Sequence, residues 1–107
     1  MPLIRIDYDD DKVTKEDIER LSVAIQKIII KETDIKEVFV YANTAQIKIG
    51  IDPIEIFIEM SAHIAEGKPD LMKSTKEALK DWKKENNFSF PINMTIIPMD
   101  WQLEIGI

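Results

Sequence analysis

Short stretches of alternating apolar and polar residues flank two longer stretches in which apolar residues recur every three or four positions. Strict alternation is typical of β-strands with one buried face. It predicts strands over residues 3–8, 35–43, 54–61 and 90–98, followed by a short final strand over 102–107. The clearest of these strands has an apolar face formed by Ile54, Ile56, Ile58 and Met60. Residues 46–49 also alternate and are a candidate for one more short strand.

Each of the two helical patterns begins at a residue suited to capping. Thr14 has Asp17 three positions later, and the spacing that follows predicts a helix from about residue 15 to 31. Asp70 can cap the second helix, which Asn86 ends, and residues 65–69 before it are expected to form a loop. The core-facing stripes of the two helices are Ile18, Leu21, Ile25 and Ile28, and Leu71, Thr75, Leu79 and Trp82.

The predicted order is β-α-β, a linker, and β-α-β again, and the two halves match at an offset of about fifty residues. The repeats cover approximately residues 1–43 and 53–98 of one domain, 1–107. A β-α-β unit makes its two strands parallel through a right-handed crossover. The pattern therefore predicts an α+β fold: a four-stranded mixed sheet with both helices on one face, plus the short C-terminal strand.

The other face of that sheet is expected to be uncovered and only partly polar. It would carry Arg5, Tyr41, Glu55, Phe57, Glu59, Asn93 and Thr95. Phe39, Phe57 and Ile97 make it too apolar to lie fully in water. Such a face in a small domain indicates oligomerisation, and the terminal strand suits pairing with a sheet edge of a neighbouring subunit.

Composition excludes several classes of function. The net charge is −6, with 20 acidic and 14 basic residues, which argues against nucleic-acid binding. The chain has no cysteine and one histidine, so we expect no metal site and no cofactor, and Asp9-Asp10-Asp11 is interpreted as a solvated turn. No apolar run approaches membrane-spanning length and no signal-peptide pattern opens the chain, which predicts a cytoplasmic protein without membrane contact.

The chain begins with a proline directly after its first methionine. Removal of Met1 would leave Pro2 with a free secondary amine. Burial that lowers the pKa of this amine would make it a neutral base that can take a proton from carbon. The alternative is that Pro2 merely precedes a strand.

Three short motifs and the internal repeat together resemble the tautomerase superfamily, which includes 4-oxalocrotonate tautomerase and macrophage migration inhibitory factor. The motifs are the opening Met1-Pro2-Leu3-Ile4, the segment 46–53 with its Gly50 and Pro53, and Ser61-Ala62-His63-Ile64 after the third strand. The opening, Asn43-Thr44 and Ile97-Pro98 are also similar to a small bacterial family assigned to the same fold.

The resemblance implies a homotrimer with pockets between its subunits, in which Pro2 is the general base for keto–enol proton transfer on a small carboxylate substrate. Arg5 is the candidate anchor for the carboxylate, and its alternative is an ion pair with Glu55 or Glu59. His63 is a candidate proton relay at the pocket rim, or a structural residue.

Trp101 is a candidate to line the pocket of a neighbouring subunit, or to form a packing contact within the trimer.

Where the inhibitory factor has a catalytic lysine, this chain has Glu32, flanked by Lys31 and Lys36. A second hypothesis therefore stays open: a non-catalytic trimer that binds a small ligand or a protein through the same clefts.

Overall fold

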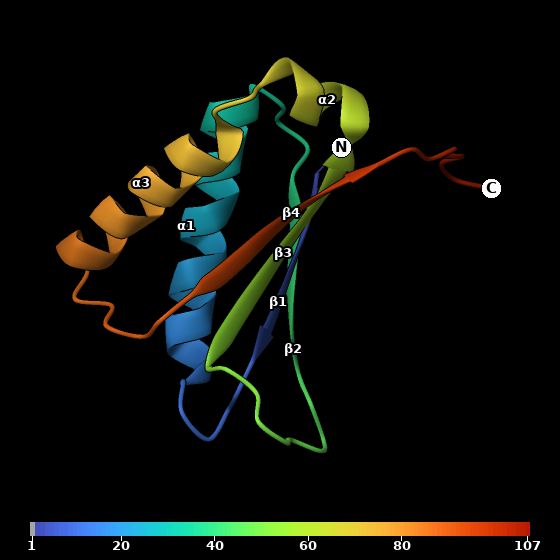
Figure 1. Ribbon diagram of the computed structural model, residues 1–107. Coiled ribbons are helices and arrows are strands. Elements are labelled where there is room, and N and C mark those ends of the chain that lie inside the picture. The colour runs from blue at the N-terminus through green and yellow to red at the C-terminus, as the bar shows by residue number, and fades with distance from the viewer. Residues whose placement is uncertain (1) are drawn as a thin grey trace.

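The computed structural model describes residues 2–107, which form one twisted sheet with helices packed on one side (Figure 1). The sheet has the strand order β2-β1-β3-β4. Strand β1 pairs in parallel with β2 and antiparallel with β3, and β3 pairs in parallel with β4. The strands are β1 (Leu3–Tyr8), β2 (Phe39–Thr44), β3 (Ile54–Ser61) and β4 (Asn93–Met99), and the helices are α1 (Lys15–Thr33), α2 (Ala62–Gly67) and α3 (Leu71–Glu85). The predicted α+β fold with a four-stranded mixed sheet is confirmed.

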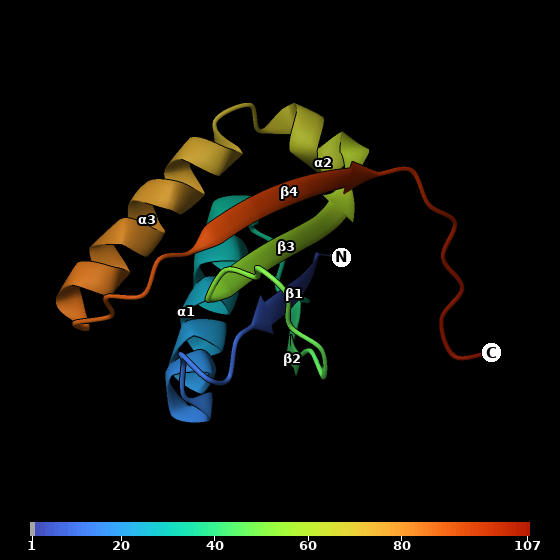
Figure 2. The same ribbon diagram turned by 60° about the horizontal axis from the view of Figure 1, so that its bottom comes forward.

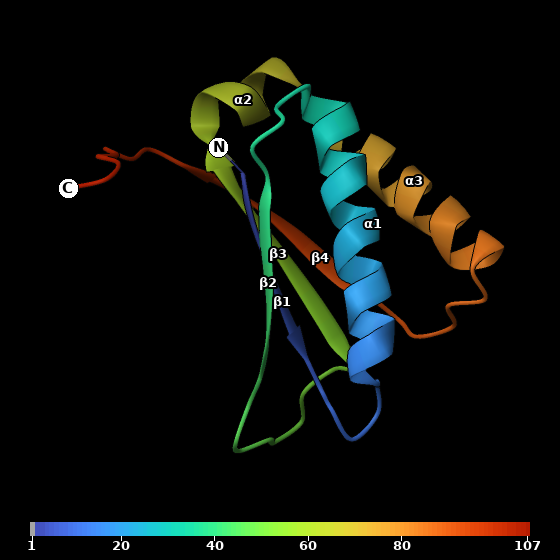
Figure 3. The ribbon, with the colours of Figure 1, turned by 180° about the vertical axis from the view of Figure 1, so that it is seen from behind.

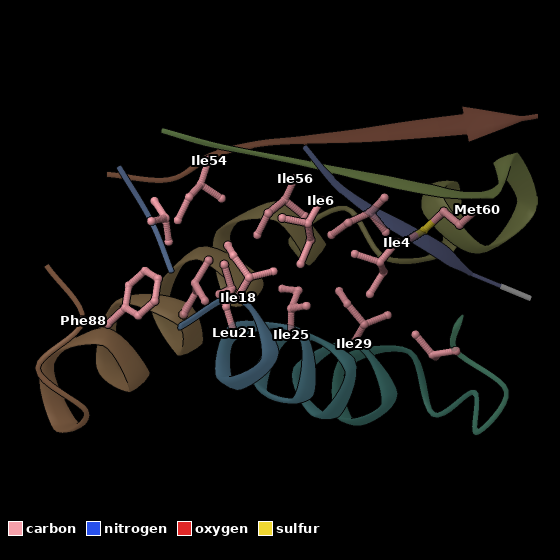
Figure 4. Packing of buried hydrophobic residues seen from close by; sticks show 14 of the residues in the cluster. Ile4, Ile6, Ile18, Leu21, Ile25, Ile29, Ile54, Ile56, Met60 and Phe88 are labelled. Atoms are coloured by element: carbon pink, nitrogen blue, oxygen red, sulfur yellow. The ribbon is translucent and has the colours of Figure 1, made fainter. Parts of the chain in front are cut away.

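The core lies between the sheet and helices α1 and α3. Alternate residues of the two central strands point into it, because successive side chains of a strand face opposite ways. Figure 4 shows the isoleucines of β1 and β3 facing the apolar stripe of α1. Residues of both central strands and of α1 are completely buried there: Ile4, Ile6, Leu21, Ile25, Ile29, Ile54, Ile56, Ile58 and Met60.

The first helix follows its prediction closely at the N-terminal end. The backbone N–H of Asp17 donates to the Thr14 hydroxyl at 3.2 Å, which satisfies one of the free donors of the first turn. At the other end the helix continues to Thr33, and Asp34 closes it in the left-handed conformation at φ 58°. Strand β2 consequently begins at Phe39, four residues later than its alternation predicts.

The loop expected over 65–69 is wrong in part, because α2 occupies residues 62–67. Its N-terminus is capped by the Ser61 hydroxyl, which accepts from the N–H of Ile64 at 3.3 Å. Ile64 and Ala65 pack against the edge of the core. The helix is only six residues long, too short for its apolar spacing to be visible in the sequence.

The short C-terminal strand expected over 102–107 is also wrong for the described chain. Residues 100–107 carry no strand, and Figures 1 and 2 show them running away from the sheet on the side opposite α3. The candidate strand over 46–49 is absent too. Both segments have the alternating pattern, but neither lies beside a strand whose backbone groups it could bond.

The face of the sheet away from the helices is open, as expected. Figure 3 shows the layers from behind, with α1 and α3 on one side of the sheet. The strand register places Arg5 between Tyr41 and Phe57, and Phe57 beside Thr95, all on this face. We refer to this surface as the open face.

Candidate functional site

Pro2 lies at the end of the sheet where several chain segments meet. It directly precedes β1, its side chain is completely buried, and its carbonyl accepts the backbone N–H of Phe39 at 3.1 Å. Because β1 and β3 are antiparallel with Leu3 opposite Glu59, the start of β1 lies beside the end of β3. The end of β4 lies there as well, since Ser61 pairs with Met99.

His63 and Trp101 follow strands that finish at this same end. His63 is exposed in the first turn of α2, immediately after β3. Trp101 lies two residues beyond β4 and is 39 % exposed. Figure 1 shows the N-terminus, α2 and the end of β4 gathered at one end of the molecule. The topology thus brings together the elements that carry three of the four predicted site residues.

Arg5 lies further along β1, on the open face, and its charge is already matched by two carboxylates. Its Nε is 3.3 Å from Oδ2 of Asp7, and its Nη1 is 3.9 Å from Oε1 of Glu59. The guanidinium also lies over the ring of Phe57, 4.6 Å from the centroid. The ion pair that the sequence offered as the alternative role of Arg5 is therefore present with Glu59. Glu55, the other expected partner, instead accepts from the Asn93 amide at 2.8 Å.

Five hollows on the described surface lie away from these four residues. These hollows of about 230 to 460 Å³ lie on residues 2–107, and none of the five is lined by Pro2, Arg5, His63 or Trp101. One hollow of about 370 Å³ lies at the opposite end of the open face, beside Asp7 and Asp52.

Lys48 forms a charge cluster that sequence reasoning missed. Its Nζ lies 3.0 Å from Asp9 and 3.2 Å from Asp11, and it also contacts Asp10. These bonds raise the pKa of the Lys48 ammonium, and the Lys48 hydrogen bond holds the pKa of Asp9 below its usual range. The three carboxylates are close enough together to hold a metal ion, but the ammonium already supplies positive charge there. The ion pairs of Lys48 connect the β2–β3 loop to the turn between β1 and α1.

Comparison with known proteins gives a likeness at the level of the fold. No family model matches the chain, and no curated protein matches its sequence. A malonate semialdehyde decarboxylase, solved also as a variant with its first residue changed from proline to alanine, matches with a TM-score of 0.65. The two sequences are 12 % identical, and the match covers 98 % of this chain and 92 % of that one.

Two further structures extend the comparison. The protein MIF2 of Leishmania major matches with a TM-score of 0.61 at 18 % identity, over 99 % of this chain and 95 % of its own. A Q0 fused 4-OT, described as a wild-type symmetric trimer, matches with a TM-score of 0.58 at 11 % identity, over 98 % and 94 % of the chains.

The chain has the tautomerase-superfamily fold. At these identities the match concerns the path of the backbone, and it carries no residue role with it. Among residues 2–107, no helix combines the length and the apolar character needed to cross a membrane.

Proposed function

We propose that this chain is a tautomerase-like enzyme that works as a homotrimer, with Pro2 as the general base once Met1 is removed. The observation that carries the proposal is the complete burial of Pro2 where the ends of β3 and β4 meet the start of β1. Burial disfavours the charged form of an amine and lowers its pKa, which is the property a proton-transferring base needs near neutral pH. The substrate class is a small enol or keto acid.

The mechanism requires one proton to move between oxygen and carbon with nothing consumed. The neutral proline nitrogen accepts a proton from the substrate, and the resulting ammonium returns it to the other atom of the enol system. The negative charge that develops on the enol oxygen needs a preorganised donor, which is usually the largest contribution in such sites.

Arg5 is proposed to bind the substrate carboxylate. The Arg5 side chain is 34 % exposed, and its partners Asp7 and Glu59, at 3.3 and 3.9 Å, are also partly exposed. Ion pairs of this kind contribute about 0–1 kcal/mol. A substrate carboxylate that makes two parallel hydrogen bonds can therefore compete for the guanidinium.

A homotrimer is proposed because none of the five hollows described above reaches the candidate site and because the open face of the single chain is uncovered. One structure with this fold is described as a symmetric trimer. In a trimer, His63 and Trp101 would lie where a neighbouring subunit can complete the cavity. The cytoplasmic location expected from the sequence stays a prediction.

A non-catalytic trimer is the second candidate, and one observation favours it. Two carboxylates already match the charge of Arg5, the cation proposed to bind the substrate. A cleft between subunits could then bind a neutral ligand or a protein without any proton transfer.

Ketonisation of phenylenolpyruvate tests the choice between the two candidates. Untagged protein whose loss of Met1 is confirmed by intact mass is compared with Pro2→Ala, and Pro69→Ala is the control because Pro69 is exposed between α2 and α3. The enzyme proposal predicts turnover that falls at least a hundredfold in Pro2→Ala and is unchanged in Pro69→Ala. Equal turnover in all three proteins, or retention of Met1, would refute the role of Pro2. Sedimentation of the same samples should give the mass of three chains.

A further inference from the structure

The groove between α3 and β4 combines an apolar floor with three lysines, although the chain as a whole is acidic. It measures about 230 Å³ and is lined by Met72, Leu79, Ile92 and Met94 together with Lys76, Lys80 and Lys83. The lysines are spaced i, i+4 and i+7, so they share one face of the helix. Within residues 2–107, no carboxylate forms an ion pair with any of them. We call this surface the lysine groove.

The size of the lysine groove argues against a small-molecule pocket. Cavities that bury drug-sized ligands measure about 300–1,000 Å³. A shallow channel beside an edge strand suits a segment of polypeptide better, because such a segment needs only one of its sides covered.

The C-terminal segment 100–107 has the complementary pattern. Leu103, Ile105 and Ile107 are 55 %, 76 % and 107 % exposed, so the isolated chain leaves three aliphatic side chains in water. They alternate with polar positions, among them Glu104, and Asp100 adds a second acidic group. An extended segment can thus place its aliphatic side chains against the apolar residues of the groove and its acidic side chains toward the lysines. The lysine side chains are long and flexible, so their ammonium groups can extend to the acidic side of the segment.

The length of the C-terminal segment agrees with the length of the lysine groove. From Leu103 to Ile107 an extended chain spans about 13 Å, at 3.3 Å for each residue. From Met72 to Lys83 the helix spans about 16 Å, at 1.5 Å for each residue. All three aliphatic side chains therefore fit within the length of the groove.

The segment that occupies the groove comes from a different molecule. The groove lies at the start of β4, beside Ile92 and Met94, whereas the segment leaves from the far end of that strand. Figures 1 and 2 both show it pointing away from α3. We propose that residues 100–107 of one copy dock in the lysine groove of a second copy. The proposal is independent of any chemistry at Pro2.

Zero-length carbodiimide cross-linking of the full chain tests this contact, because the reagent joins only a carboxylate and an amine that touch. Chains labelled with ¹⁵N and unlabelled chains are mixed in denaturing urea, refolded together and cross-linked, so that the subunits of any oligomer are exchanged at random. We expect Glu104 joined to Lys76, Lys80 or Lys83, with one label on each side in about half of the pairs, as random mixing of two equal pools requires. Cross-links only within one label, cross-links of Glu104 to lysines outside α3, or no cross-link would each overturn the proposal. A trimer with Glu104 cross-linked elsewhere would do so while leaving the proposed trimer intact.

Two sets of variants separate the apolar and the ionic parts of the contact. Leu103→Asp should weaken self-association about tenfold or more, because an aliphatic anchor is lost. Val23→Asp on α1 is the matched control, since Val23 is 51 % exposed and lies outside the groove. Glu104→Lys, and the change to glutamate of whichever groove lysine cross-links to Glu104, should each weaken association by about two- to fivefold, and the double variant should restore it. Failure of the double variant to restore association, or equal effects of Leu103→Asp and Val23→Asp, would contradict the proposal.

Discussion

Replacing Thr75 by valine should stabilise the protein. Thr75 lies in α3, is completely buried, and its hydroxyl oxygen has no hydrogen-bond partner within the described chain. Valine has nearly the same shape, so the substitution removes the unpaired hydroxyl without opening a cavity. Thr33 offers a matched control: it is 6 % exposed, its hydroxyl donates to the carbonyl of Ile29 at 2.7 Å, and it accepts the N–H of Ile35 at 3.3 Å.

The magnitudes follow from the cost of burying polar groups. A buried hydroxyl without a partner costs about 1–3 kcal/mol, so Thr75→Val should raise the free energy of unfolding by about that amount. Thr33→Val removes two hydrogen bonds and leaves the N–H of Ile35 without its partner, so it should lower the free energy of unfolding by about 1–3 kcal/mol. Valine and threonine have similar helix propensities, which therefore cancel.

Urea denaturation at a fixed protein concentration measures both effects, because the stability of an oligomer depends on concentration. The midpoint should rise for Thr75→Val and fall for Thr33→Val, with unchanged slopes. In thermal unfolding, each kcal/mol should shift the midpoint by about 4–8 °C. Equal losses of stability in the two variants would show that packing, rather than hydrogen bonding, decides the outcome, and would refute the reasoning.

Three further predictions concern a helix cap, a charge cluster and the proposed substrate contact. Thr14→Ala should lower the free energy of unfolding in urea by about 0.5–2 kcal/mol, because the first turn of α1 loses its cap; no change would contradict that role. The pKa of Asp9 is lowered by Lys48, so its contribution to stability is present above its ordinary pKa of 3.8 and is lost as the pH falls through the lower folded value. Urea midpoints between pH 2 and 7 should show this loss, and Lys48→Met should reduce it; the same acid dependence in both proteins would refute the assignment. Arg5→Gln should raise KM for phenylenolpyruvate about tenfold or more with a smaller change in kcat, and an unchanged KM would exclude the proposed carboxylate contact.

The central strands could be predicted from the sequence because their apolar and polar residues alternate, which indicates the buried and the open face of each strand. Ile54–Ser61 alternates without interruption, and its boundaries agree with β3 as observed. Residues 102–107 alternate as well, but they form no strand in the described chain. Alternation predicts which side of a segment is buried, whereas a strand also needs a neighbour whose backbone groups it can bond.

The candidate site was predictable only in part. The strand register confirms that Arg5 and Glu59 share the open face, which the alternation of each strand already indicated. Asp7 is on the same face two residues away and could have been recognised as a partner from its spacing. Lys48 and Asp9 are 39 positions apart, and only the path of two loops brings them together. Contacts of that kind depend on tertiary structure and leave no local pattern.

The pKa of the Pro2 nitrogen is the most direct test of the central claim. Protein with ¹⁵N-labelled proline and with Met1 removed would be titrated by NMR, and a short peptide with the same N-terminal sequence would serve as the reference. We expect an amine resonance whose pKa lies below that of the peptide, because burial disfavours the ammonium. An amide resonance that does not titrate, or a pKa equal to that of the peptide, would contradict the assignment of Pro2 as a base.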